Sequence, residues 1–150
     1  MAVDIQLLKK LREETGISVS ECRNALEEAN GDYQKALKLL NERAAEKAAK
    51  KADRETGEGL VEAYIHGNGK VGVLVQILCE TDFVARTDEF KHLAHEVAMQ
   101  IAAMQPKDVE ELLAQEYIKD SSKTIEQMVK EAIQKTGENI KIKQFTRYEL

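Results

Sequence analysis

The chain has 150 residues, of which 43% are hydrophobic and 33% charged, with eight glycines, one proline, two cysteines and no tryptophan. This composition favours a globular protein of one domain or two small ones, and so few cysteines exclude a disulfide framework and fit a cytoplasmic protein. The net charge of −5 and the seven aromatic residues argue against a general nucleic-acid binder, and the longest apolar run, 71–79, is too short to cross a membrane.

The first forty residues predict three short helices. A stripe of leucines at helical spacing marks the first helix, which a Thr-Gly pair ends; the leucines are Leu7, Leu8 and Leu11. Ser18 begins the second helix in a capping box with Glu21, and Asp32 caps the third. Together they predict a small three-helix domain over residues 1–42.

Alanine and lysine dominate residues 43–56. This composition predicts a basic helical linker that is solvated on most sides and ends before Gly57 and Gly59. We therefore place a domain boundary here and expect a second domain over residues 57–150.

Two alternating apolar segments, 61–65 and 71–79, flank the turn 66–69 and predict a β-hairpin. Leu74 and Leu78 add apolar side chains on the opposite face of the second strand. For this reason we expect that strand to be buried on both sides.

The rest of the chain predicts helices and one closing strand. Thr81 and Thr87 are the expected caps of a short and a long helix. Weaker helical patterns follow at 109–113 and 125–133, and the closing strand spans 140–148. The expected fold class is α+β: an N-terminal three-helix module, a helical linker, and a small antiparallel three-stranded sheet with packed helices.

Candidate groups for catalysis or metal binding are few. His92 and His95 are spaced as two metal ligands on one helix could be, but the sequence provides no evident third ligand. Cys22 and Cys79 lie on inward-facing stripes, where a small buried thiol is common and nothing activates a nucleophile. The sequence therefore predicts no enzyme, no metal site and no cofactor.

Phe83 lies between the buried strand and the long helix, out of phase with the apolar stripe of that helix. It could close the local core, or it could project as an apolar wedge of the kind that anchors protein interfaces. Periodicity alone favours the first interpretation.

Several segments together resemble the bacterial elongation factor Ts family, the guanine-nucleotide exchange factors of elongation factor Tu. The resemblance covers nearly the whole chain, and the Thr-Asp-Phe-Val-Ala run is a specific signature. The matching segments, in family order, are LREETGIS at 11–18, ECRNALEEANGD at 21–32, KAAKKA at 47–52, CETDFVAR at 79–86 and GENI at 137–140.

The resemblance implies an N-terminal domain of the ubiquitin-associated (UBA) type that docks on the nucleotide-binding domain of elongation factor Tu. Matched by position, the docking residues are Arg12, Thr15, Gly16, Ile17, Ser18, Val19 and Arg23. It also implies that a short turn is inserted beside the magnesium and phosphate site of the GTPase, and this turn is Thr81, Asp82, Phe83 and Val84. On this basis Phe83 is expected to project as the wedge.

Two departures from longer relatives affect what is expected. Those relatives carry two copies of the core subdomain, whereas residues 57–150 have room for one copy. Short relatives restore the doubled core by homodimerising, so we expect a symmetric homodimer bound to two GTPases. The segment 106–124 is also shorter than in many relatives and lacks a helical excursion.

Three alternative functions use other features of the sequence. A UBA-like adaptor unrelated to translation would use only the N-terminal helices. An RNA-associated protein would use the basic linker, although the net negative charge falls on the second domain because residues 1–56 carry 11 basic and 11 acidic residues. An enzyme with His92 and His95 as a metal site is the remotest alternative.

Overall fold

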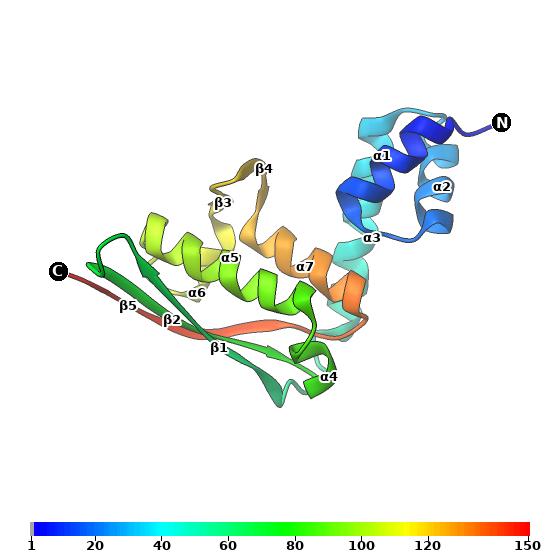
Figure 1. Ribbon diagram of the computed structural model, residues 1–150. Helices are drawn as coiled ribbons and strands as arrows, with labels where there is room; N and C mark the ends of the chain where they lie inside the picture. Colours follow the sequence, from blue (N-terminus) through cyan, green and yellow to red (C-terminus); the bar gives the residue numbers. More distant parts are fainter. Residues whose placement is uncertain (1) are drawn as a thin grey trace.

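Three helices form the N-terminal part of the computed structural model, which describes residues 2–150 (Figure 1). They are α1 (Ile5–Thr15), α2 (Val19–Glu28) and α3 (Tyr33–Lys51). Their facing stripes enclose a small cluster whose fully buried members include Leu11, Leu26 and Leu40. The expected three-helix arrangement therefore follows from apolar residues at helical spacing.

The helix caps agree with the sequence in position but differ in one detail. Ser18 and Asp32 cap α2 and α3 as expected, each accepting a hydrogen bond from a backbone N–H in the first turn. The Glu21 carboxylate accepts from the Ser18 hydroxyl at 3.2 Å and pairs with Lys47, so it does not complete the expected capping box. A reciprocal capping box occurs instead at Thr124, the N-cap of a later helix.

Helix α3 joins the third predicted helix and the predicted linker into one continuous element. Leu40 belongs to the N-terminal cluster, and Ala48, two turns later, belongs to the larger core of the chain. The alanines of this segment are small enough to let α3 pack closely, so Ala44 and Ala48 are buried. Lys50 is exposed, whereas Lys47 and Lys51 are half-buried. Since α3 runs without a break across residue 42, the division into a domain over 1–42, a linker over 43–56 and a domain over 57–150 remains a proposal.

An antiparallel three-stranded sheet forms one layer of the larger part, as the sequence predicts. Its strands are β1 (Glu58–His66), β2 (Val71–Cys79) and β5 (Lys141–Glu149), with β2 in the centre. Gly59 lies inside β1. This position requires glycine because a Cβ there would come within 2.0 Å of the Ile77 carbonyl oxygen. Its φ of +149° also disfavours other residues.

Helices cover only one face of this sheet (Figure 1). Val73, Val75 and Ile77 of β2 point to the covered face and are buried. Leu74 points to the other face and is 48% exposed, so the expectation that β2 is buried on both sides was wrong. The alternating apolar residues of β1 also lie on this outer face, and Val61 and Ile65 are exposed there.

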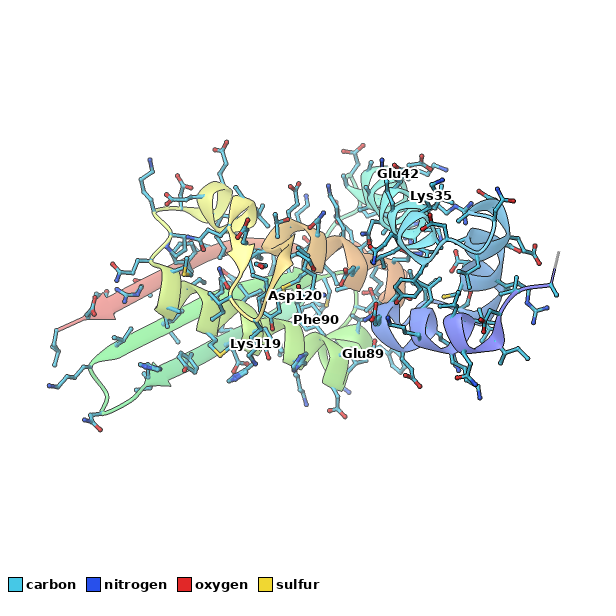
Figure 2. All side chains as sticks on the ribbon, turned by 90° about the horizontal axis from the view of Figure 1, so that it is seen from above. Lys35, Glu42, Glu89, Phe90, Lys119 and Asp120 are labelled. Carbon is cyan, nitrogen blue, oxygen red and sulfur yellow. The ribbon has the colours of Figure 1, made fainter. Side chains whose placement is uncertain are left out.

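Four helices and a small hairpin complete the chain. The helices are α4 (Asp82–Ala85), α5 (Asp88–Met104), α6 (Val109–Ala114) and α7 (Ile125–Thr136). The long helix α5 packs on the sheet, and its buried Phe90 lies beside α7 (Figure 2). The hairpin consists of β3 (Glu116–Tyr117) and β4 (Asp120–Thr124), which the sequence analysis did not predict. Across residues 2–150, no helix is both long enough and apolar enough to cross a lipid bilayer.

Candidate partner-binding surfaces

The short helix α4 forms a sharp corner between β2 and α5, and we call Thr81–Ala85 the wedge turn. Thr81 accepts a hydrogen bond from the Val84 N–H at 3.3 Å and so caps α4. Thr87 donates to the Val84 carbonyl at 2.7 Å and accepts from the Phe90 N–H at 3.2 Å, which ends one helix and begins the next. Two threonine caps therefore fix both ends of the corner.

Within the wedge turn, one side is buried and the other projects into solvent. Val84 and Ala85 are buried in the core, whereas Phe83 is 78% exposed. The interpretation of Phe83 as part of the local core was therefore wrong. Val84, which was expected among the partner-contacting residues, is only 6% exposed, so its side chain anchors the turn from below.

Asp82 provides the charge of the wedge turn. Its carboxylate accepts from the Arg86 guanidinium at 2.7 Å, and both side chains are largely exposed. Because exposed ion pairs of this kind contribute about 0.2–1 kcal/mol, Asp82 is free to exchange Arg86 for another donor. The turn thus presents an aromatic ring and an available carboxylate next to each other.

Long-range hydrogen bonds support the wedge turn from below. One Glu138 oxygen, Oε1, accepts from the backbone N–H groups of Glu80 and Thr81 at 3.1 and 3.0 Å, and Oε2 accepts from the Thr81 hydroxyl at 2.7 Å. The Asn139 backbone N–H donates to the Glu80 carboxylate at 2.5 Å. Glu138 and Asn139 lie in the matching segment 137–140, but no local sequence pattern indicates these contacts.

Cys79 ends β2 beneath the same turn. Its thiol lies 3.1 Å from the Thr81 carbonyl oxygen, to which it donates. Burial, together with the nearby Glu138 carboxylate, raises the pKa of this thiol to about 11. The group therefore stays a neutral thiol at ordinary pH and packs as a small apolar residue.

The docking residues expected from the sequence surround the turn between α1 and α2, and we call residues 12–23 the dock loop. Thr15 and Ile17 are buried. The Thr15 hydroxyl donates to the Leu11 carbonyl at 2.7 Å and accepts from the Ile17 N–H at 3.3 Å. Gly16 has a φ of +66°, which ends α1 in the left-handed conformation. Thr15 and Ile17 therefore hold the shape of the dock loop and do not form its surface.

The surface of the dock loop comes from the remaining expected residues. Arg12, Gly16, Ser18, Val19 and Arg23 are exposed, and Val19 is an apolar residue at the start of α2. Two exposed arginines and an exposed valine are thus among the residues expected to dock, and arginine and apolar side chains are common in protein interfaces.

Both surfaces lie toward the same end of the sheet, opposite the C-terminus (Figure 1). The end of α7 lies between them. The Lys135 side chain lies over Gly16, where a Cβ would come within 2.6 Å of its Cε atom. Three residues later, Glu138 contacts Thr81. The dock loop and the wedge turn are therefore connected through a single short stretch of chain.

The two histidines considered as a metal site have separate neighbours. His92 is exposed and lies 3.6 Å from the Glu96 carboxylate. The rings of His95 and Tyr64 pack edge to face, with their centroids 5.7 Å apart. Within residues 2–150, no three side chains of the metal-binding types come together.

Glu96 is a buried carboxylate in this region. It accepts from Lys119, which lies in the turn between β3 and β4 over α5, at 2.8 Å (Figure 2). Burial acts to raise the pKa of Glu96, but the hydrogen bond from Lys119, together with the nearby Tyr117 hydroxyl, outweighs it and holds this pKa below its ordinary value. Glu96 and Lys119 therefore form an ion pair that connects the β3–β4 hairpin to α5.

Comparisons with known proteins agree in one family. A family described as elongation factor TS matches residues 80–150, which include the wedge turn and Glu138. A protein of Thermotoga maritima named elongation factor Ts is 42% identical, with 100% of this chain and 97% of that protein covered. A protein of the same name from Fervidobacterium nodosum is 40% identical, with 100% and 99% covered. These alignments extend over 193 and 195 positions, so both relatives contain residues that this chain of 150 lacks.

Proposed function

The chain belongs to the elongation factor Ts family, and from this premise we propose that it is a guanine-nucleotide exchange factor that promotes GDP release from elongation factor Tu. The observation that carries the proposal is the position of Phe83. An aromatic side chain that is 78% exposed, on a corner fixed by two threonine caps, has no role in the core of this protein. Such a residue is suited to insertion into a pocket of a partner.

The proposed mechanism acts on the contacts that hold GDP. A GTPase binds GDP mainly through its phosphates, by backbone N–H groups of the phosphate-binding loop, a lysine and a magnesium ion. Insertion of Phe83 between elements of the GTPase displaces the groups that position the metal. Weakening one or two charge-assisted contacts by about 3–4 kcal/mol accelerates release by roughly two to three orders of magnitude.

Asp82 has a supporting role in this proposal. Its carboxylate is exposed and paired only with exposed Arg86, so it can accept hydrogen bonds from the GTPase when the wedge turn is inserted. Val84 and Ala85 are buried in the core, so the wedge turn cannot shift on insertion without disrupting core packing.

The dock loop gives the complex its affinity in this proposal. Arg12, Val19 and Arg23 are exposed and form the contact with the nucleotide-binding domain of the GTPase. Gly16 and Ser18 contribute backbone and hydroxyl groups between them, and Thr15 and Ile17 keep the loop in shape. Binding in two places lets one surface hold the partner while the other distorts its nucleotide site.

Thermodynamic linkage limits what such a factor can do. If binding of the factor weakens GDP binding, GDP must weaken binding of the factor by the same free energy. The protein therefore changes the rate of nucleotide exchange and leaves the final nucleotide equilibrium of the free GTPase unchanged. No covalent step is required, so we propose that the protein is not an enzyme.

We further propose that the protein acts as a homodimer joined through the outer face of its sheet. Four large apolar side chains on this face are exposed: Val61, Ile65, Leu74 and Tyr148. Apart from Lys141 and the bulged Lys143 near one end, the outer positions of the three strands carry no charged side chain. In a chain that is one-third charged, this favours an equally apolar and uncharged partner, and a second copy provides that surface.

Stopped-flow release of a fluorescent GDP from elongation factor Tu tests the exchange function. We expect the wild type to accelerate GDP release strongly. With Phe83→Ala the acceleration should be about a hundredfold smaller, a loss typical of a central interface residue. Ile118→Ala is the matched control because Ile118 is also an exposed apolar residue, 42% accessible, but lies on the β3–β4 hairpin. Absence of acceleration at concentrations where light scattering shows a complex would contradict the proposal and favour a UBA-like adaptor.

Sedimentation equilibrium tests the homodimer. Leu74→Asp places a charge at the centre of the outer face and should convert the dimer to a monomer, whereas Ile118→Asp should leave the mass unchanged. A wild type that remains monomeric at high micromolar concentration would contradict the dimer and leave the exchange function untouched.

A further inference from the structure

A carboxylate that lies far away in the sequence supports the entry to the wedge turn. A helix of four residues cannot hold its own geometry, because forming one turn fixes several backbone dihedrals for very few hydrogen bonds. The direction in which Phe83 projects must therefore be set by contacts outside α4. The caps Thr81 and Thr87 and the burial of Val84 and Ala85 provide some of these contacts. Glu138 provides the hydrogen bonds to the backbone that leads into the turn.

Glu138 binds the residues that lead directly into the wedge turn. Its Oε1 atom accepts from two consecutive backbone N–H groups, of Glu80 and Thr81, and its Oε2 atom accepts from the Thr81 hydroxyl. The same hydroxyl oxygen accepts from the Val84 N–H and so caps α4. A carboxylate makes stronger hydrogen bonds than a neutral acceptor, and three donors hold it in one orientation.

Hydrogen bonds of the next residue, Asn139, fix Glu138 and the wedge turn relative to the rest of the protein. Asn139 donates its backbone N–H to the Glu80 carboxylate, and its side-chain amide donates to the carbonyl oxygens of Ala52 and Arg54 at 3.3 and 2.9 Å. The Arg54 guanidinium in turn lies 3.6 Å from Glu80. Asn139 is only 2% exposed, so the segment that carries Glu138 is fastened to the end of α3 and to the core.

We propose that Glu138 is a positioning residue for nucleotide exchange, which fixes the direction of Phe83 through the backbone of Glu80 and Thr81. This inference rests on the proposed exchange function. A wedge accelerates release only when it is held in the inserted orientation, because a flexible wedge loses part of its binding free energy in becoming ordered. Glu138 itself lies beneath the turn and needs no contact with the GTPase.

The kinetic signature separates positioning from binding. In stopped-flow GDP release measured over a range of factor concentrations, Glu138→Ala should lower the maximal release rate by about tenfold, while the half-saturating concentration changes by less than about threefold. Glu138→Gln should restore most of the rate, since an amide oxygen still accepts from both N–H groups and the amide nitrogen donates to the Thr81 hydroxyl. Glu126→Ala is the matched control, an exposed glutamate at the start of α7 whose neighbour is Lys130.

A double-mutant cycle with Phe83→Ala excludes a general effect of Glu138 on folding. If Glu138 acts through Phe83, Glu138→Ala should change the release rate by less than about twofold when Phe83 is already alanine. Equal effects of Glu138→Ala in the two backgrounds would overturn the proposal. If Glu138→Ala proves unfolded by circular dichroism, Glu138→Asp replaces it in the cycle, because that carboxylate keeps its charge but is too short to reach all three donors.

Amide hydrogen exchange of the free protein provides a readout without the GTPase. In the wild type, the Glu80 and Thr81 amides should be protected, and Glu138→Ala should remove this protection while that of α5 stays unchanged. Unchanged protection at Glu80 and Thr81 would overturn the proposal. Failure of the exchange function itself is recognised separately: the wild type then gives no acceleration, whereas failure of this inference leaves the wild type active and Glu138→Ala equally fast.

Discussion

The dock loop and the wedge turn share one design but are held in place by different parts of the chain. In each, a buried apolar residue anchors a turn from which an exposed apolar residue projects: Ile17 beneath Val19, and Val84 beneath Phe83. In the dock loop the hydrogen bonds that fix the turn join residues 11–22 to one another. In the wedge turn they include bonds from Glu138, more than fifty residues away.

Because of this difference, we expect the two surfaces to respond to substitutions in different parts of the chain. The hydrogen bonds that shape the dock loop lie within the three N-terminal helices, although Lys135 of α7 also lies over Gly16. The geometry of the wedge turn, in contrast, requires that β2, α7 and the end of α3 are all in place. Substitutions can therefore weaken one surface and spare the other. Four predictions use this independence, beginning with the largest expected effect.

Asn139→Ala should affect the wedge side most strongly. Asn139 is 2% exposed, and loss of its side-chain amide removes two part-buried hydrogen bonds, to the carbonyl oxygens of Ala52 and Arg54. We expect a loss of about 2 kcal/mol in the free energy of unfolding. Urea unfolding followed by circular dichroism measures the loss. Asn24→Ala, an exposed change on α2, should stay within about 0.5 kcal/mol, and an equal loss in both variants would contradict the comparison.

Thr15→Val is the corresponding change on the dock side. It keeps the size of the side chain but leaves the Ile17 N–H without its acceptor, which should destabilise the N-terminal helices by about 1 kcal/mol. Amide exchange should rise in α1 and α2 and remain unchanged at Glu80 and Thr81. Increased exchange at the wedge turn would show that the two surfaces are not independent.

Val19→Ala should weaken docking and leave the wedge intact. Removal of an apolar side chain that is 41% exposed should raise the half-saturating concentration for GDP release by about threefold, with the maximal rate unchanged. The same stopped-flow titration measures both parameters. A fall in the maximal rate would contradict the assignment of Val19 to docking alone.

Acid should loosen the dock side slightly through Glu21. A hydrogen bond from Lys47 lowers the pKa of Glu21 below its ordinary value of 4.5, against the opposing effect of partial burial. A pKa lowered in the folded state gives stability that is present above the ordinary value and is lost as the pH falls through the lowered value. Stability should therefore fall below about pH 4.5.

Glu96 also has a lowered pKa and contributes to the loss of stability in acid. Comparison of the wild type with Glu21→Gln isolates the contribution of Glu21, because Glu96 is present in both proteins. The variant should show a shallower loss of stability with acid in the N-terminal helices than the wild type does. Identical slopes in the two proteins would exclude Glu21 as a source of the acid sensitivity.

Most of the secondary structure could be predicted because its signals are local. The caps Ser18, Asp32, Thr81 and Thr87 each hydrogen-bond a backbone group three residues away, and helical stripes repeat over a few turns. The α+β class follows from these elements in order, and the Thr-Asp-Phe-Val-Ala run indicates the family. The β3–β4 hairpin was missed because its strands are short and polar and carry no alternation.

Local sequence patterns were sufficient to place most of the helices and strands, although not the β3–β4 hairpin. The matching segments indicated the family and, through it, which residues could form the two contact surfaces. Periodicity did not indicate that Phe83 projects, although the family resemblance implied it, and the structure places its side chain in solvent. The burial of Val84, the uncovered face of the sheet and the support from Glu138 followed from the tertiary structure alone. The physical reason is the range of the interactions. Caps and periodicity act over three or four residues, whereas burial and the hydrogen bonds of Glu138 depend on segments that come together only when the chain has folded.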